Sequence, residues 1–199
     1  MKNNTLIFAS NNVHKVEEIN SIIGDLFTVI SLDKAGIDID IPEPHDTIEA
    51  NASEKSTTIY RLTKQNCFGD DTGLEVKALN GEPGVKSARY AGEGKSFGKN
   101  IEKLLLKMQG IENRDAQFRA VLSLILNGTE YKFEGICKGI ILADCKGEGG
   151  FGYDPVFVPA GAKKTFAEMN MEEKNIFSHR RKAMDKLTDF LHSFSKKDK

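Results

Sequence analysis

Two strand-like segments, residues 116–126 and 131–142, constrain the fold more than any other feature of this sequence. The dipeptide Asn127-Gly128 lies between them, and it favours a tight hairpin turn because both residues tolerate a positive φ. We therefore expect a β-hairpin in the second half of the chain, so that the fold must contain a β-sheet.

The N-terminal part predicts helices that alternate with strands. Residues 6–9 are typical of a buried strand, a second strand is expected at 27–32, and a polar turn follows the first strand. Asp46 and Glu49 resemble a capping pair that opens a helix toward Gln65. The helix after the first strand would carry an apolar face made of Val13, Val16, Ile19, Ile23 and Leu26.

Two further helices are expected later in the chain. The apolar face of the first would consist of Ile101, Leu104, Leu105 and Met108. Ser178 can cap the last helix, whose apolar face would consist of Ala183, Leu187, Phe190, Leu191 and Phe194. The alternation of strands and helices indicates an α/β protein, and 199 residues fit one domain over 1–199.

Charge and cysteine content exclude several functional classes. A formal net charge of −1 gives no basic footprint for nucleic acid. The three cysteines form no CxxC pair, so we expect reduced, mostly buried thiols rather than disulfides or a zinc site. No apolar run reaches membrane-spanning length and no signal peptide is evident, which predicts a cytoplasmic protein without membrane contact.

The stretch from Gly149 to Phe157 has the composition of a shaped binding loop. Its glycines allow a backbone to approach a ligand closely, and Pro155 favours an extended conformation of Asp154. An aromatic ring next to Gly152 could face a flat base or sugar, or it could only plug a hydrophobic surface.

The stretch from Ser10 to Lys15 joins a strand to a helix N-terminus, where free N–H groups favour an anion. Lys15 opposes the helix dipole there, which makes more sense if an anionic ligand lies nearby. The alternative is that Ser10 only caps the helix and Lys15 extends into solvent.

Asp70 and Asp71, placed between a strand and a turn, offer adjacent carboxylates that point to different sides. One could bind a hard cation such as Mg²⁺ together with substrate phosphates, and Glu43 on an acidic loop is a second candidate ligand. The alternative is an Asx-turn pair with a solvated acid.

The run from Glu173 to Arg181 gathers hydrogen-bond donors at the expected start of the last helix. Lys174, His179 and Arg180 could face one ligand, and the arginines sit badly against the positive end of the dipole, which again suggests an anion. A solvated, charged helix start is the alternative.

Taken together, five motifs resemble the inosine triphosphate pyrophosphatase family, enzymes that remove non-standard purine nucleoside triphosphates. They occur in the family's order and span nearly the whole chain. The motifs are Ser10-x-Asn12-x-x-Lys15, Asp70-Asp71-Thr72-Gly73-Leu74, Pro83-Gly84-Val85-x-Ser87-Ala88-Arg89-Tyr90-Ala91-Gly92, Gly149 through Phe157, and Glu173-Lys174-Asn175-x-x-Ser178-His179-Arg180. Thr72 stands where serine is usual, and Asn11 and His14 stand where glycine is common.

The resemblance implies an elongated α/β fold with a mixed β-sheet core, flanking helices, and two lobes with the active site in a cleft between them. It also implies a homodimer. The implied reaction is Mg²⁺-dependent hydrolysis of the inosine, deoxyinosine and xanthosine triphosphates to monophosphate and pyrophosphate. The alternatives are a non-catalytic nucleotide-binding protein on the same scaffold and a pyrophosphatase for other modified nucleotides.

The resemblance also implies roles for individual residues. Glu43 and Asp71 would hold the metal, Asp71 would act as the base toward water, and Thr72 would touch the substrate. The residues that would bind the phosphates are Ser10, Asn11, Asn12, Val13, His14 and Lys15. The nucleoside pocket would be lined by Phe151, Gly152, Tyr153 and Asp154. Lys174, His179 and Arg180 would donate to the oxygen at C6 of the base, where the amino group of adenine would leave donors facing donors.

Overall fold

The computed structural model describes residues 5–23 and 27–197. The strands are β1 (Thr5–Phe8), β2 (Thr28–Ser31), β3 (Cys67–Val76), β4 (Pro83–Gly84), β5 (Asp115–Leu126), β6 (Thr129–Ile141) and β7 (Phe157–Pro159). The α-helices are α1 (Val13–Ile23), α2 (Ile48–Thr63), α3 (Phe97–Lys107), α4 (Met171–Phe177) and α5 (His179–Lys197). Short 3-10 helices cover Lys77–Leu79, Ser87–Arg89, Asp154–Val156 and Phe166–Glu168. Within the described ranges, none of the helices is long and apolar enough to cross a membrane.

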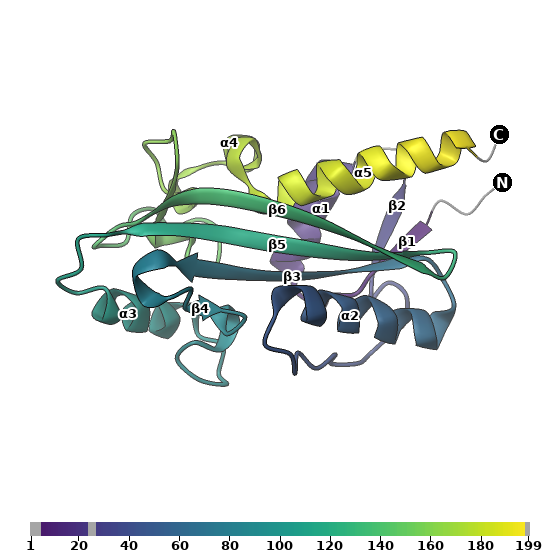
Figure 1. Cartoon of the computed structure of the whole chain (residues 1–199), viewed down its shortest axis with the longest axis horizontal. Helices are drawn as coiled ribbons and strands as arrows, with labels where there is room; N and C mark the ends of the chain where they lie inside the picture. Colours follow the sequence, from purple (N-terminus) through teal and green to yellow (C-terminus); the bar gives the residue numbers. More distant parts are fainter. Residues whose placement is uncertain (1–4, 24–26, 198–199) are drawn as a thin grey trace. The chain divides into compact units, whose positions relative to one another are not determined.

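The strands form a mixed sheet in the order β2-β1-β3-β5-β6-β7, and β4 pairs with β3. β1 pairs in parallel with β2 and with β3, whereas β3 pairs antiparallel with β4, and β6 antiparallel with β7. Figure 1 shows the helices packed beside these strands. The α/β class with a mixed sheet and flanking helices is therefore confirmed.

The predicted hairpin is present. β5 and β6 are joined at Asn127 and Gly128, whose φ angles of 51° and 83° are the positive values that this turn requires. The two strands run side by side in Figure 1.

The chain divides into two compact units. Unit 1 comprises the described residues of Met1–Asp71, Ala120–Gly135 and Arg180–Lys199, and unit 2 comprises Thr72–Arg119 and Ile136–His179. The chain passes from one unit to the other within β3, β5 and β6, and again between His179 and Arg180.

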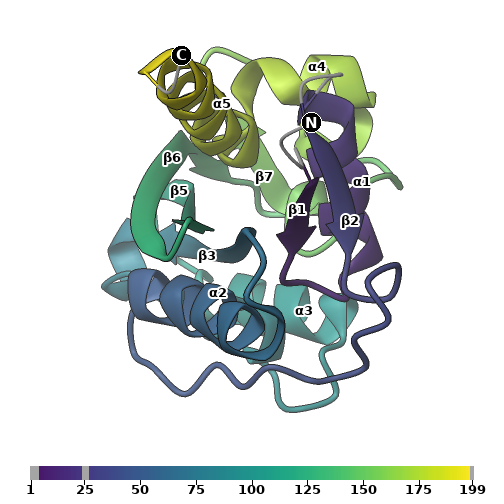
Figure 2. The ribbon, with the colours of Figure 1, turned by 90° about the vertical axis from the view of Figure 1, so that its right-hand side faces the viewer.

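In unit 1, helices cover both faces of the strands, as Figure 2 shows for α2 and α5. One core cluster packs α1 and α5 on alternate residues of β1, including Leu6 and Phe8. The other faces α2 and contains Ile7 and Ala9. This alternation follows from the two-residue period of a strand, which turns successive side chains to opposite faces.

Two details of the helix predictions are wrong. The cap of α2 is Thr47, whose hydroxyl accepts from Ala50 N at 3.2 Å, rather than Asp46. Val13 is 64% exposed, so it does not belong to the buried face of α1, although Ile19 is fully buried there. The position of Leu26 and the side chain of Ile23 lie outside the described residues.

Unit 2 has its own apolar core. Leu74 and Val76 of β3 pack with α3, with β5 and β6, and with the segment that leads into β7. The aromatic members of this cluster are Tyr90, Phe118, Tyr153, Phe157 and Phe166. Cys67 and Cys137 are buried, Cys145 is exposed, and all three are free thiols, as predicted.

Candidate active site

Asp70 and Asp71 lie inside β3, and the predicted strand end at this point is wrong. β3 continues unbroken to Val76 and pairs with β4 beyond the two acids. Both residues are buried, with 0% and 5% of their surface exposed. Their side chains meet different partners, as the alternation of a strand requires. Cationic partners on both sides compensate for the poor strand propensity of aspartate.

Lys55 of α2 binds two acidic side chains of unit 1. Its Nζ lies 2.8 Å from Asp71 Oδ1 and 2.5 Å from Glu43 Oε1, and it donates to the backbone oxygen of Asp70 at 3.0 Å. Burial alone would lower the pKa of this ammonium, but Asp71 and Glu43 outweigh burial and raise the pKa above its ordinary value. Lys55 therefore stays charged and holds both carboxylates at one point.

Close packing of α2 on β3 makes this contact possible. A Cβ atom on Gly69 would lie 2.6 Å from the backbone oxygen of Ala52 and 2.8 Å from Cβ of Lys55. Any larger residue at Gly69 would push the helix away from the strand. The glycine thus sets the distance from which Lys55 reaches Asp71.

Asp71 has one oxygen available for chemistry. Its Oδ2 is buried and has no hydrogen-bond partner among the described residues. Burial raises the pKa of this carboxyl group, while Lys55 and Lys15 oppose the rise. A buried acceptor of this kind suits either a cation or a proton of a bound water.

Lys15 projects from the first turn of α1, and the structure supplies an anion for it. Its Nζ lies 3.3 Å from Asp70 Oδ2 and 3.4 Å from the backbone oxygen of the same residue. Burial lowers the pKa of Lys15, and Asp70 opposes the change. The anion that the sequence suggested near Lys15 is thus, at least in part, a carboxylate of the protein itself.

The remaining residues of the predicted phosphate loop shape the start of α1. Asn12 Oδ1 accepts from Lys15 N at 3.3 Å, and Ser10 Oγ accepts from Asn12 N at 3.2 Å. Asn11 Nδ2 donates to Ile39 O at 3.1 Å. Val13 and His14 are exposed. The cap is therefore Asn12 rather than Ser10, and Ser10 supports it from two residues earlier.

Arg180 is buried between two carboxylates of unit 1. Its Nε donates to Asp70 Oδ2 at 2.9 Å, and its Nη1 donates to Glu18 Oε2. Burial opposes the charge of Arg180, but Asp70 and Glu18 outweigh burial and raise its pKa. The anionic partners that the sequence suggested for this arginine thus include two side chains of the protein.

Phe151, Asp154 and Lys174 come together in unit 2. Asp154 Oδ2 accepts from Lys174 Nζ at 2.7 Å and from Phe151 N at 2.9 Å. Lys174 Nζ also lies 5.0 Å from the centroid of the Phe151 ring. Asp154 begins a 3-10 helix, so the extended conformation predicted for it is wrong, because proline also fits the first turn of a helix.

Tyr153 and His179 are buried in unit 2. The Tyr153 hydroxyl donates to Ser87 O at 2.9 Å, and its ring belongs to the core cluster. The His179 ring stacks on Phe118 with the centroids 4.9 Å apart. Gly152 adopts a φ of 61°, which explains why glycine precedes Tyr153.

The prediction that the donor-rich run from Glu173 to Arg181 forms the start of one helix is wrong, because the run is divided between two helices. Lys174 belongs to α4, which ends at Phe177 with Ser178 as its C-terminal cap, and α5 begins at His179. The one acid of the run, Glu173, caps α4, because it closes a capping box with Asn170.

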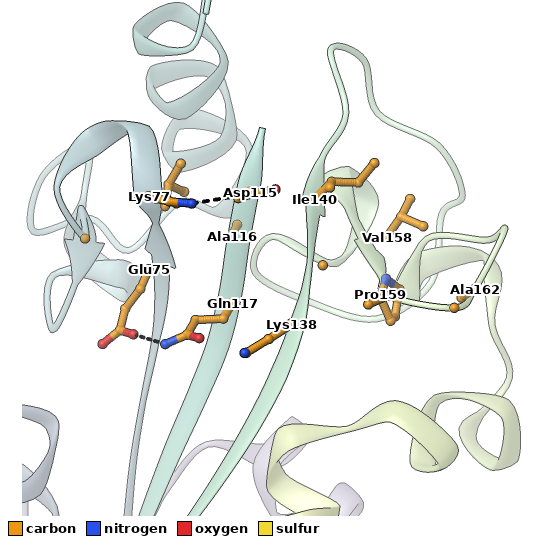
Figure 3. A pocket seen from close by; sticks show the side chains of 15 residues that line it. Glu75, Lys77, Asp115, Ala116, Gln117, Lys138, Ile140, Val158, Pro159 and Ala162 are labelled. Carbon is orange, nitrogen blue, oxygen red and sulfur yellow. Dashed lines mark hydrogen bonds and ion pairs between the residues drawn. The ribbon is translucent and has the colours of Figure 1, made fainter. Parts of the chain in front are cut away.

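A pocket of about 740 Å³ opens on the strands of unit 2. Figure 3 shows two polar pairs on its wall, Glu75 with Gln117 and Lys77 with Asp115, and an apolar side at Ile140 and Val158. None of the residues that line this pocket is among the predicted site residues. The pocket therefore shares no residue with the predicted site.

Sequence reasoning missed Lys55 and Glu18. Lys55 could have been found, because it lies on the buried stripe of α2 that also contains Ile48, Ala52 and Ile59 at three-to-four spacing. A charged residue in such a stripe needs a buried partner of opposite charge. No comparable pattern distinguishes Glu18.

Comparisons with known proteins identify the family of this chain. The model of the Ham1 family matches residues 6–190. A dITP/XTP pyrophosphatase of Flavobacterium johnsoniae is 50% identical over 186 residues, covering 94% of this chain and 97% of that protein. A dITP/XTP pyrophosphatase of Porphyromonas gingivalis is 47% identical over 187 residues, covering 94% of this chain and 96% of that protein.

A solved structure has a similar fold. The Ham1 protein of Staphylococcus aureus has a TM-score of 0.86 and 42% sequence identity, covering 95% of this chain and 98% of that chain. The family resemblance inferred from the five motifs is thus confirmed, and this chain belongs to the Ham1 family.

Proposed function

We propose that this protein hydrolyses the inosine, deoxyinosine and xanthosine triphosphates to the monophosphate and pyrophosphate. The observation that carries the proposal is the buried Asp71, with one oxygen on Lys55 and the other without a hydrogen-bond partner among the described residues. The relatives that are named dITP/XTP pyrophosphatase support this substrate class.

Asp71 acts as the base in the proposed reaction. Its Oδ2 accepts a proton from water, the water oxygen attacks the α-phosphorus, and the bond from that phosphorus to the bridging oxygen breaks. Pyrophosphate leaves and the nucleoside monophosphate carries the new oxygen. Lys15 stabilises phosphate charge, and Arg180 helps to hold Asp70, the acidic partner of Lys15.

Mg²⁺ is the proposed cofactor, with Glu43 and Asp71 as its protein ligands. These carboxylates fit a hard cation, because Lys55 already holds an oxygen of each at one point. The described residues contain no group of three or more His, Cys, Asp or Glu side chains arranged for a metal. Substrate phosphates and water would complete the coordination, and the cation would offset charge on the phosphates.

Recognition of the base is assigned to unit 2. Phe151 offers a half-buried ring beside the ammonium of Lys174, so that an aromatic face and a donor lie together. A donor that faces C6 donates a hydrogen bond to the oxygen of hypoxanthine or xanthine and disfavours the amino group of adenine. We further propose that the protein is cytoplasmic and forms a homodimer. Light scattering of the purified protein would test the dimer.

A substrate panel tests the reaction. Purified protein with Mg²⁺ would be given the inosine, deoxyinosine and xanthosine triphosphates, with ATP and GTP as controls, and pyrophosphate and orthophosphate would be measured separately. In water enriched with ¹⁸O, the label should appear in the nucleoside monophosphate. Release of orthophosphate, label in pyrophosphate, or equal turnover of ATP would contradict the proposal, and binding without product would support the non-catalytic alternative.

A further inference from the structure

The motif from Pro83 to Gly92 has no part in the function proposed above, yet it is tied tightly into unit 2. Ser87 is its centre. The Ser87 hydroxyl accepts from Leu74 N at 2.9 Å and donates to Gly84 O at 2.6 Å. Leu74 belongs to β3 and follows Thr72 by two residues, so Ser87 is attached to the strand that carries the candidate catalytic acid.

Asn100 of α3 fixes the rest of the motif. Its side chain is 1% exposed and contacts three backbone groups: Oδ1 accepts from Ala91 N at 2.7 Å, and Nδ2 donates to Ala88 O at 3.0 Å and to Ser87 O at 3.3 Å. A buried amide that satisfies three backbone groups gives the segment one conformation, since any other would leave polar groups unpaired.

Tyr153 joins this fixed segment to the loop of the nucleoside pocket. Its hydroxyl donates to Ser87 O, the same oxygen that accepts from Asn100. A carbonyl oxygen has two lone pairs and can accept both hydrogen bonds. Tyr153 is 3% exposed, and burial raises the pKa of its phenol, so it stays a donor.

The loop depends on such an anchor because its own sequence favours many conformations. Gly150 and Gly152 have positive φ angles of 72° and 61°. A Cβ atom on Gly150 would lie 2.2 Å from Asp154 Oδ2, so this loop backbone packs directly on the carboxylate that binds Lys174. Glycines that permit this approach also raise the entropy of the free loop.

We propose that Ser87, Asn100 and Tyr153 are positioning residues that anchor the loop from Gly149 to Asp154 to β3, and so fix Phe151 and Lys174 for recognition of the base. Ser87 and Asn100 have no assigned contact with the nucleotide, and the hydroxyl of Tyr153, which the family resemblance placed in the nucleoside pocket, instead donates to Ser87 O. The expected effect of these residues on base specificity rests on the proposed function. The anchoring of the loop does not, because it can be measured in the protein without nucleotide.

Tyr153→Phe tests the anchor with the smallest change, and Tyr90→Phe is the matched control. Tyr90 lies in the same core cluster, is also buried, and donates its hydroxyl to Glu82 Oε2 at 2.8 Å rather than to Ser87 O. Each variant loses one phenolic hydrogen bond, so each melting temperature should fall by a similar amount, roughly 2–4 °C.

Amide hydrogen exchange of the nucleotide-free protein gives the first readout. A peptide covering residues 149–154 should exchange faster in Tyr153→Phe than in wild type, and at the wild-type rate in Tyr90→Phe. Unchanged exchange in Tyr153→Phe, or an equal increase in both variants, would overturn the anchoring. This readout stands even if the wild type fails to hydrolyse inosine triphosphate, a failure that would refute only the proposed function.

Kinetics give the second readout. Tyr153→Phe should raise the KM for inosine triphosphate roughly 3- to 10-fold, the effect of losing one hydrogen bond, with a smaller change in kcat. The ratio of kcat/KM for inosine triphosphate to that for ATP should fall, while the Kd of inorganic tripolyphosphate should not change. A fall in kcat alone, or equal weakening of tripolyphosphate, would show that the hydroxyl does not act through the base.

Discussion

Replacing Glu18 by alanine removes one carboxylate from the buried guanidinium of Arg180. The side chains of Arg180, Glu18 and Asp70 are only 1%, 4% and 0% exposed. Breaking a buried ion pair by removing one partner costs roughly 3–5 kcal/mol, because the remaining charge keeps its desolvation penalty. Since Asp70 stays on the guanidinium, we expect the lower end, about 3 kcal/mol. For a chain of this size, that loss lowers the melting temperature by roughly 6–12 °C.

Asp185→Ala is a matched control on the neighbouring arginine of the same helix. Arg181 Nε lies 2.7 Å from Asp185 Oδ1, but the two side chains are 40% and 50% exposed. An exposed pair four residues apart in a helix contributes only about 0.3–0.5 kcal/mol. The contrast between the variants therefore isolates burial, since both remove the carboxylate partner of an arginine in α5.

Urea unfolding followed by circular dichroism measures both free energies of unfolding. Glu18→Gln, which keeps an acceptor but loses the charge, should fall between wild type and Glu18→Ala. If Glu18→Ala costs no more than Asp185→Ala, the buried charge cluster does not stabilise the fold, and the reasoning is refuted.

Four other predictions concern the site and the core. Asp71→Asn should abolish release of pyrophosphate while inosine triphosphate still binds by calorimetry; retained turnover would remove Asp71 from the role of base. Chelation of Mg²⁺ should stop turnover reversibly, and activity in excess chelator would exclude the proposed cofactor. Gly69→Ala should destabilise the fold by roughly 1–3 kcal/mol because its Cβ meets α2, whereas Gly98→Ala, inside α3 with open space, should stabilise by up to about 1 kcal/mol, as urea titration would show. Burial raises the pKa of Cys67 to about 12, so N-ethylmaleimide at pH 9 should label Cys145 in the native protein and leave Cys67 unlabelled, as peptide mass spectrometry would reveal.

Local patterns predicted much of the fold. The hairpin at Asn127-Gly128 and the strand–turn–helix at the N-terminus depend on residues that are neighbours in sequence, so their signals are readable there. The path of β3 through Asp70 and Asp71 was missed, because aspartates favour turns when solvated. Distant cations, Lys15, Lys55 and Arg180, make these acids compatible with a buried strand.

The partners of the charged site residues also could not be predicted from the sequence. Lys15 and Arg180 each suggested an anion because they oppose a helix dipole, and in both cases the protein supplies Asp70. Sequence can indicate that a charge needs a partner, but it does not distinguish a ligand from a carboxylate that folding brings close.

The contact between Glu18 and Arg180 spans 162 positions, and this separation matters during synthesis. At ribosomal rates of roughly 5–20 residues per second, about 8–32 s pass between the two codons. During that interval the nascent chain has made the acid at 18, and later the acid at 70, but not yet the arginine that neutralises them. Unit 1 thus cannot complete its interior before Arg180 has been made, and a chain cut short before α5 keeps unpaired buried acids that proteases and chaperones can recognise.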